Sequence, residues 1–572
     1  MIPLAYLLDD DALRHKVDRY VGYILDHQGE DGWFGPRAMV AAANRPENPH
    51  YDLWAQLLIT KVLYEYRRAT GDPRIVEAQL KHLRLLDRII DRGPLFNWAQ
   101  FRWFEALIAV YDLYETTGQS WLLALAVKLH AQGFDWAAFF KRWPLTGPTP
   151  RGRWNYMGHV VNNAMAVKGP ALWYRLSGDP DDREAPQAML DRLDRYHGSV
   201  TGVFTGDECL AGPRPTQGTE LCAVVELAYS LEILLSTLGD PRFGDRLEEV
   251  VYNALPATFA PDMWSHQYDQ QVNQIECSAR DDWPWTTNGP ESNLFGLEPN
   301  YGCCTANLSQ GWPKFAAHLW METGRGDDGG LAALAYAPCR VQAEIQGVPV
   351  TVEVETGYPF RDTVRLTVTA DKPVAFPIHL RIPEWGTPAT VQVAGEEPDQ
   401  AQHSGHFYGL YRKWQETTQV TLTFPMSPAL RRGYNGAVAL QRGPLIYALP
   451  IGEDWRRAHP DRPVPEPWPS DDWEIHPTTP WNYALDLDPQ ALSETVQVAE
   501  RPLGELPFSP DGAPISLSVQ GRRLPEWGRD GGCAADAPQS PVRSAEPLES
   551  LTLIPYGCTN LRITEFPVLE ST

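Results

Sequence analysis

A recurring helix-stop signal constrains the fold more than any other feature of this chain. In the first half, four helical stretches end at a glycine followed by Asp-Pro or Gln-Ser, namely Gly71, Gly118, Gly178 and Gly239. A glycine just past a helix adopts the left-handed conformation, and the Asp or Ser then caps the next helix, whose first turn tolerates proline. A recurrence of roughly 50 to 60 residues predicts a ring of helix pairs.

The stretches between these stops show the 3.6-residue period of helices. Residues 51–68 carry a wide apolar face, whereas 160–176 and 221–238 are apolar on nearly every side. A helix that is apolar all round is buried, as the inner helices of a double-layered barrel are. Further helices are predicted at 101–117 and 308–320.

The apolar period changes from 3.6 to two after about residue 330. Short alternating runs separated by turns are typical of β-sandwich strands. The predicted strands span 348–355, 363–369, 378–382, 390–393 and 420–424.

These patterns predict a multidomain α + β protein. An N-terminal (α/α)6 barrel is expected, followed by C-terminal β-sandwich domains of the jelly-roll type. The predicted boundaries are 1–328 for the helical catalytic domain, 329–433 for a β-sandwich and 434–572 for a second β-rich domain with long loops.

The formal net charge of −24 bears on partners and location. Nucleic acid and anionic membrane surfaces require clusters of Lys and Arg, so neither is an expected partner. The chain has no uninterrupted run of about 18 apolar residues and no basic, then apolar, N-terminal segment. We therefore expect no transmembrane helix, no signal peptide and a cytoplasmic location. The oligomeric state stays open, with a homodimer as one option.

Eight cysteines in 572 residues are too few for a disulfide scaffold, which favours reduced thiols and metal binding. Cys303 and Cys304 are adjacent, and Cys222 follows Glu220 at a spacing of two. Three thiols and one carboxylate form a full tetrahedral ligand set for Zn²⁺, which would keep the thiols deprotonated. The alternative for each cysteine is a small buried apolar side chain.

A second candidate group is the acidic turn 206–212, in which Glu208 lies twelve residues before Glu220. A carboxylic acid beside a metal-bound thiolate can protonate a leaving group and later activate water. The alternative is an ordinary exposed acid in a turn.

Polar and aromatic side chains form a third group, which is typical of pocket loops. In the helical half it contains Arg102, Trp103 and His159, and in the segment 264–312 it contains His266, Gln267 and Tyr268. Aromatic faces and hydrogen-bonding side chains together suit a sugar ligand. A satisfied core histidine is an equally good interpretation of His159.

Together these motifs resemble the β-L-arabinofuranosidases of glycoside hydrolase family 127. The most specific matches are Glu220-Leu-Cys222, the following helix with Tyr-Asn near its end at 248–255, and Gly-Cys-Cys at 302–304. The segments 436–450 and 553–557 are similar to the family's signatures in its β-domain.

The resemblance implies an (α/α)6 barrel followed by β-sandwiches, and a retaining mechanism with a zinc-bound cysteine nucleophile. By position, Cys303 corresponds to the nucleophile, Glu208 to the general acid/base and His159 to a sugar-contacting histidine. The implied zinc ligands are Glu220, Cys222, Cys303 and Cys304. The implied substrate carries a terminal β-L-arabinofuranose on a plant-derived glycan.

The chain departs from better-known members of the family near the expected substrate site. Arg102-Trp103 stands where those members have a histidine, and the loop between Glu208 and Glu220 is shorter. Because arginine pairs with carboxylates in a bidentate manner, an acidic branched pectin sugar of the aceric acid type is a rival substrate. The sugar, its linkage and the aglycone therefore stay open.

Two interpretations from other classes also remain. One is a carbohydrate-binding protein without catalysis, in which zinc only joins the loops. The other is a polysaccharide lyase, because lyases also combine helical toroids with β-sandwiches and use tyrosine with histidine. Tyr268 with His266 or His159 would supply such a pair.

Overall fold

The computed structural model describes residues 1–37, 39–42, 45–297, 302–324, 329–403, 405–463 and 471–570. The chain divides into two compact units. Unit 1 comprises Met1–Leu145 and Trp154–Arg192, and unit 2 comprises Thr146–Arg153 and Leu193–Thr572. The three domain boundaries predicted from the sequence remain a proposal.

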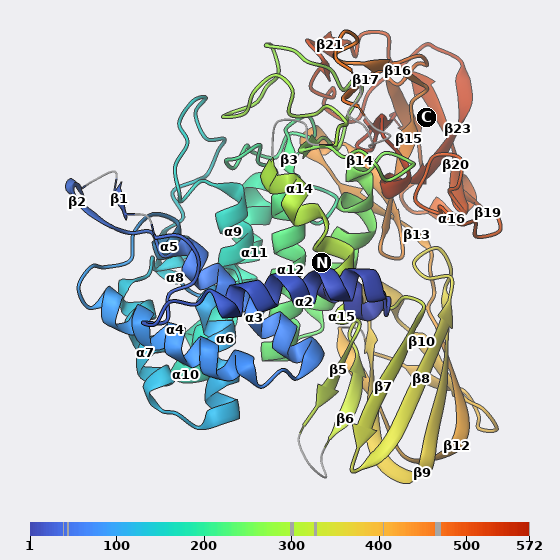
Figure 1. Ribbon diagram of the computed structural model, residues 1–572. Helices are drawn as coiled ribbons and strands as arrows, with labels where there is room; N and C mark the ends of the chain where they lie inside the picture. The colour runs from blue at the N-terminus through green and yellow to red at the C-terminus, as the bar shows by residue number, and fades with distance from the viewer. Residues whose placement is uncertain are drawn as a thin grey trace. The chain divides into compact units, whose positions relative to one another are not determined.

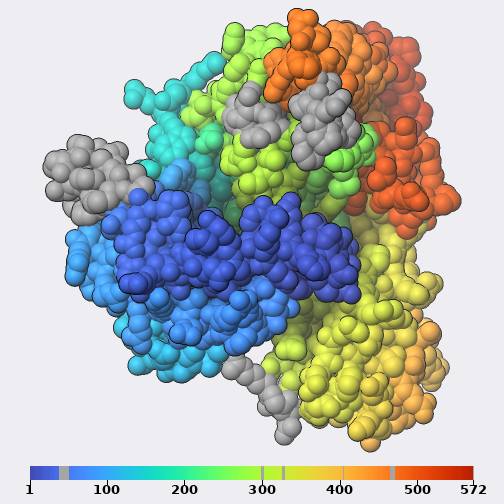
Figure 2. All heavy atoms as spheres, viewed as in Figure 1, coloured from blue at the N-terminus to red at the C-terminus, as the bar shows by residue number. Residues whose placement is uncertain are grey.

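Unit 1 is helical (Figure 1). Its elements are α1 (Ile2–Leu7), α2 (Asp11–Asp26), β1 (Met39–Ala42), β2 (Arg45–Tyr51), α3 (Trp54–Thr70), α4 (Arg74–Ile90), α5 (Asn97–Phe101), α6 (Glu105–Thr117), α7 (Trp121–Gln132), α8 (Trp136–Arg142), α9 (Val160–Ala166), α10 (Gly169–Ser177) and the start of α11 (Pro180–His197). Helix α2, dark blue in Figure 2, buries Val17 and Val21 against Leu63 and Tyr66 of α3.

The predicted helix stops are confirmed at all four glycines. Gly71, Gly118, Gly178 and Gly239 follow α3, α6, α10 and α12 with φ values of 69°, 67°, 64° and 63°. Each backbone N–H is donated to a carbonyl four residues earlier, which satisfies one of the free carbonyls at the helix end.

Two predicted helices are shorter than expected. The stretch 160–176 is divided into α9 and α10, because Pro170 has no N–H to continue the helical ladder. The predicted helix 101–117 begins only at Glu105, so Arg102 and Trp103 lie in the break between α5 and α6.

The helical part of unit 2 surrounds one deeply buried helix, α12. Its elements are β3 (Thr219–Glu220), α12 (Leu221–Leu238), α13 (Arg242–Glu249), the π-helical turn η1 (Val250–Ala254), η2 (Pro256–Thr258), β4 (Asp269–Gln270), α14 (Gly302–Leu308) and α15 (Gly311–Ala317). Among the described helices only α12 is long and apolar enough to cross a membrane. Since 78% of that stretch is buried in the protein, it matches a core helix equally well.

The first large sheet follows the helices. It contains β5 (Trp320–Thr323), β6 (Gly330–Ala333), β7 (Cys339–Ile345), β8 (Val348–Thr356), β9 (Thr363–Ile382), β10 (Ala389–Val393), β11 (Asp399–Ala401) and β12 (His406–Thr423). The two strands predicted at 363–369 and 378–382 are one strand, β9, paired with β12 along its length. The register of β12 shifts between Trp414 and Glu416, opposite Pro373 of β9. The shift accommodates the proline, which lies in the gap between the two predicted strands.

The second large sheet lies near the C-terminus. Its strands are β13 (Pro428–Arg432), β14 (Val438–Arg442), β15 (Leu445–Pro450), β18 (Tyr483–Asp486), β19 (Gln497–Glu500), β20 (Ile515–Arg523), β23 (Leu548–Pro555) and β24 (Arg562–Ile563). Small elements accompany the sheets: η4 (Glu384–Gly386), η5 (Tyr434–Gly436), the pairs β16 (Glu453–Arg457)–β17 (Trp473–Pro477) and β21 (Arg529–Asp530)–β22 (Cys533–Ala534), α16 (Leu492–Thr495) and η6 (Tyr556–Cys558). The predicted fold class is thus confirmed: a helix-rich N-terminal region precedes β-rich sheets.

Candidate functional site

A small backbone ribbon in unit 2 brings the acidic residues of the site together. Strands β3 and β4 are antiparallel, with Glu220 opposite Asp269. The Gly206 N–H is donated to the Gly218 carbonyl at 2.8 Å, and the Glu220 N–H to the Gly206 carbonyl at 3.0 Å. The turn that carries Glu208 is therefore fixed to the strand that carries Glu220, although twelve residues separate the two acids.

The start of α12 and the short helix α14 supply the thiols. Figure 1 shows α14 beside the beginning of α12. Glu220, Cys222, Cys303 and Cys304 each offer a ligand atom, and these atoms lie within 4.8 Å of one another. The Cys222 and Cys304 sulfurs are 3.2 Å apart, and the Asn307 amide donates to Cys222 Sγ at 3.2 Å.

The cysteine pair lies in a helix, α14, which begins six residues before the helix predicted at 308–320. Cys303 and Cys304 occupy the first turn of α14, where free backbone N–H groups favour negative charge. Asn300 and Tyr301, which precede them in the sequence motif, lie outside the described residues.

The chemistry of this donor set fits a metal cation. Glu220, Cys222 and Cys304 are buried while Cys303 is exposed, so one sulfur faces outward. Glu220 Oε2 has no hydrogen-bond partner, which is unfavourable for a buried carboxylate unless a cation contacts it. Burial raises the pKa of Glu220 well above its usual value, and the charges of Glu208 and Cys303 raise it further. The group can therefore hold a metal ion through three sulfurs and one oxygen.

The three thiols differ in acidity. Hydrogen bonds from Cys222 and Cys304 lower the pKa of the Cys303 thiol. The bond with Cys303 raises the pKa of Cys222, and burial raises that of Cys304. Cys303 is therefore the exposed thiol of the group and the one whose pKa is lowered.

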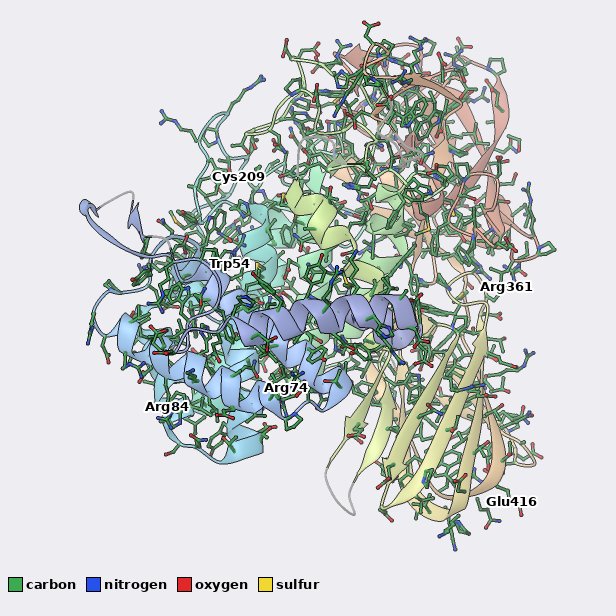
Figure 3. All side chains as sticks on the ribbon, viewed as in Figure 1. Trp54, Arg74, Arg84, Cys209, Arg361 and Glu416 are labelled. Carbon is green, nitrogen blue, oxygen red and sulfur yellow. The ribbon has the colours of Figure 1, made fainter. Side chains whose placement is uncertain are left out.

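Glu208 is half-buried and has an unusual backbone. Its φ of 105° lies in the left-handed region that favours glycine. Its Oε1 atom accepts a hydrogen bond of 2.7 Å from the Tyr268 hydroxyl. The neighbouring residue Cys209, labelled in Figure 3, is buried. Tyr268 itself is fully buried, and burial raises the pKa of its phenol, so the hydroxyl stays protonated and donates a hydrogen bond to Glu208.

Two further buried acids, Asp207 and Asp269, lie next to the site, and the sequence analysis missed them as functional residues. Burial raises the pKa of Asp207 to about 6 and that of Asp269 well above its usual value. Their partners are 19 to 81 residues away in the chain, so no local spacing reveals them.

His266 and Gln267 make contacts within the protein. His266 Nε2 lies 3.0 Å from the Thr305 hydroxyl of α14, which links the 264–268 segment to the helix of the cysteine pair. Gln267 is fully buried, and its amide donates to the Asn293 carbonyl at 2.7 Å. Of the three residues predicted in this segment, Tyr268 is thus brought to Glu208 and His266 to α14. Gln267 joins a buried network.

The remaining predicted residues belong to unit 1. The Arg102 guanidinium carbon lies 4.9 Å and 4.3 Å from the ring centres of Trp54 and Trp98, and its Nε donates to Asn162 Oδ1 at 2.7 Å. Trp54 is labelled in Figure 3. His159 caps α9 by accepting the Asn162 N–H, and its ring meets Trp98 edge-on.

Trp103 does not belong to this aromatic cluster. It is only 5% exposed, and its indole N–H is donated to the Phe134 carbonyl. Together with His130 and Trp173 it lines a separate cavity of about 500 Å³ in unit 1.

Two family models match the chain and cover both its helical and its first β-rich part. Residues 3–317 match the catalytic domain of the GH127 β-L-arabinofuranosidases, and residues 330–426 match the GH127 middle domain. The chain is therefore a glycoside hydrolase, and its substrate is a glycan. It belongs to glycoside hydrolase family 127. No curated protein sequence matches the chain.

Solved structures share the same fold over nearly the whole chain. A protein described as a glycoside hydrolase has a TM-score of 0.70 at 17% identity, covering 98% of this chain and 89% of its own. A GH127 β-L-arabinofuranosidase from Geobacillus stearothermophilus T6 has a TM-score of 0.67 at 21% identity, with coverages of 98% and 87%. A third structure, described as a GH127 β-arabinofuranosidase, has a TM-score of 0.66 at 19% sequence identity. The match covers 99% of this chain and 87% of that protein.

Proposed function

We propose that this protein is a retaining exo-glycosidase that releases a terminal β-L-arabinofuranose-type sugar from plant-derived glycans. The observation that carries the proposal is the convergence of Glu220, Cys222, Cys303 and Cys304 on one point, with Cys303 exposed. These residues would hold a zinc ion, which when bound keeps its thiolate ligands deprotonated at neutral pH.

In the first step Cys303 acts as nucleophile and Glu208 as acid. The Cys303 thiolate attacks the anomeric carbon, the bond from that carbon to the leaving oxygen breaks, and Glu208 donates its proton to that oxygen. The product is a glycosyl thioether on Cys303 and a free aglycone. In ordinary retaining enzymes a carboxylate takes the nucleophile's place.

In the second step Glu208 acts as base. Its carboxylate removes a proton from water, the water oxygen attacks the anomeric carbon, and the carbon–sulfur bond breaks to restore the Cys303 thiolate. Two displacements return the anomeric configuration, and Glu208 regains its proton. Tyr268 donates to Glu208 throughout and so keeps the carboxyl oriented.

Arg102 favours a second candidate substrate with the same mechanism, a glycoside of an acidic branched sugar of the aceric acid type. Its guanidinium lies within 5 Å of two indole rings and is held through Nε by Asn162, so its orientation is restricted. A guanidinium held in this way suits the two oxygens of a carboxylate.

The geometry gives less support to the two interpretations from other classes. A lyase needs a tyrosine that removes a proton from the substrate. The Tyr268 hydroxyl already donates a hydrogen bond to Glu208, and burial raises its pKa, which disfavours the phenolate that would act as the base. A non-catalytic zinc site needs no exposed ligand, whereas Cys303 is exposed. The cytoplasmic location and the absence of nucleic-acid and membrane partners are part of this proposal.

The test is hydrolysis of an aryl β-L-arabinofuranoside by the wild type and by Cys303→Ser. The variant should lose turnover on the order of 10⁴-fold or more, as nucleophile removal does elsewhere, while its fold is retained. Cys339→Ser, a cysteine of β7 outside the cluster, is the matched control and should keep full activity. Cleavage of an acidic pectin oligosaccharide with an inert arabinofuranoside would select the second substrate. An unsaturated product would select the lyase.

A further inference from the structure

The backbone of Glu208 requires an explanation that the reaction itself does not give. A non-glycine residue with φ of 105° is strained, and such strain persists only where surrounding contacts hold it. The turn is fixed on one side by the Thr149 N–H, donated to the Leu210 carbonyl at 2.8 Å. On the other side the Gly212 N–H is donated to His197 Nδ1 at 3.0 Å. Neither contact reaches Glu208 itself.

The contacts that lie directly beside Glu208 are made by the residue before it, Asp207. The Asp207 carboxylate is fully buried and accepts three hydrogen bonds from one segment, 286–288. They come from the Thr286 hydroxyl at 2.6 Å, the Thr287 N–H at 3.1 Å and the Asn288 N–H at 3.2 Å. The Thr287 hydroxyl also donates to the Asp207 carbonyl at 3.3 Å, at the peptide bond that leads into Glu208.

The same segment is joined to the strand opposite Glu220. The Asn288 amide donates to Asp269 Oδ2 at 3.0 Å, and Asp269 pairs with Glu220 in the β3–β4 ribbon. Gly218 lies between the two acids: a Cβ there would come within 2.9 Å of Asp269 Cγ and 3.2 Å of Asp207 Cβ. The 286–288 segment therefore connects the turn of Glu208 with the strand of a predicted metal ligand.

Tyr268 contacts the side chain of Glu208, whereas Asp207 acts on its backbone. Because the Tyr268 hydroxyl is donated to Glu208 Oε1, Oε2 is the oxygen that would carry the proton that Glu208 transfers. The backbone of Glu208 is thus fixed through Asp207, and the rotation of its carboxyl is fixed through Tyr268.

We propose that Asp207 is a positioning residue which, through its bonds to Thr286, Thr287 and Asn288, holds Glu208 in its left-handed conformation and so aims the acid/base at the anomeric centre. This inference rests on the proposed function, in which Glu208 transfers the proton. Asp207 touches neither the substrate nor the reacting atoms.

The principal test is Asp207→Asn, measured as kcat/KM on aryl glycosides of the sugar that the wild type releases, with phenols of graded acidity. Asparagine keeps the shape but has no charge and only one oxygen, so it cannot accept both from the Thr286 hydroxyl and from the N–H groups of Thr287 and Asn288. Misplacement of the acid should lower kcat/KM by about 10²-fold for the least acidic phenol. It should have a much smaller effect for 4-nitrophenol, which leaves without a proton.

Two further readouts separate positioning from loss of fold. Azide needs no base, so it should restore turnover of Asp207→Asn on the 4-nitrophenyl substrate. Thr286→Val should show the same dependence on the phenol in weaker form, and Thr286→Ser should restore the wild-type rates. Asp488→Asn is the matched control, since Asp488 accepts an N–H from Gln490 in an exposed turn of the β-rich part.

The outcomes keep this inference apart from the proposed function. An equal loss on every phenol without azide rescue, at unchanged melting temperature, overturns the positioning role, as does a wild-type profile of Asp207→Asn. If Asp207→Asn does not fold, the Thr286 pair decides by the same criteria. If Glu208→Gln itself keeps the wild-type rate, the proposed function has failed at Glu208, and the inference fails with it.

Discussion

Unit 2 contains two buried clusters of carboxylates that differ in how their charge is balanced. In the first, Glu248 of α13 contacts Arg381 of β9 at 2.5 Å and accepts the Tyr358 hydroxyl at 2.5 Å and the Tyr336 N–H at 3.0 Å. Asp245 contacts the same arginine. In the second, Glu220 has an oxygen without a hydrogen-bond partner and lies beside three thiols.

The contrast shows what each cluster does. The Arg381 cluster contains its own cation and joins the helices to the first sheet, so it is structural. No Lys or Arg of the described part of the chain pairs with Glu220, although the carboxyl groups of Glu208 and Asp269 lie near it. Since buried negative charge needs a partner, the second cluster can hold a metal cation.

The largest expected effect comes from removing the internal cation. Arg381→Met should lower the free energy of unfolding by about 3–5 kcal/mol, because Glu248 and Asp245 then remain buried without their partner. Urea unfolding of the metal-free protein measures it. Glu220→Gln, in the same assay, should leave stability unchanged or higher. Equal destabilisation by both variants would contradict the comparison.

Metal removal should have the next largest effect. With free zinc at about a thousand times its Kd, bound metal should add about 4 kcal/mol to the free energy of unfolding, and a chelator should remove that increment. The stabilisation should vanish in Glu220→Gln and persist in Arg381→Lys. Differential scanning calorimetry with and without zinc measures the shift in Tm.

A pH effect of intermediate size is expected from Asp207. Its pKa is raised to about 6 in the folded protein against 3.8 as its ordinary value, so folding favours its protonated form. That contribution is complete below pH 3.8 and is lost as the pH rises through 6, by roughly 2–3 kcal/mol. The loss should be absent in Asp207→Asn. Unfolding free energies of both proteins, metal-free, between pH 4 and 7 test the difference.

The smallest effect concerns backbone strain. Compared with Glu208→Ala, Glu208→Gly should have a free energy of unfolding about 1 kcal/mol higher, because both variants lose the hydrogen bond from Tyr268 but only glycine accepts a positive φ without strain; both lose activity. Glu416→Gly, at an exposed residue with φ of 51° in the bulge of β12 and labelled in Figure 3, is the control and should keep activity. Equal stability of Glu208→Gly and Glu208→Ala would show that the turn is not strained.

Local signals predicted the fold better than they predicted the site. Gly71 and Gly239 end helices because the conformation required at a helix end depends on one residue. The sequence predicted two strands, 363–369 and 378–382, where the structure has one, β9; the register shift opposite the gap lies in β12, about 40 residues away. Long-range pairing therefore decided what the local sequence left open.

At the site, resemblance to a family pointed to Cys303 and Glu220, whose ligand atoms the structure brings within 4.8 Å of each other, whereas spacing alone left each cysteine ambiguous. The support of Glu208 was not predictable. Asp207 is one acid in a turn, and Thr286 and Asn288 are ordinary polar residues until the fold places them together across about 80 positions. Their function follows from contacts and not from any pattern in the sequence.

The most direct test of the central claim combines metal content with turnover. The claim predicts one zinc ion per chain in the wild type, loss of that ion together with hydrolysis of the aryl glycoside after treatment with a chelator, and recovery of both on adding zinc. In Cys304→Ser both should be lost. Full hydrolysis by protein shown by elemental analysis to be free of metal would contradict it.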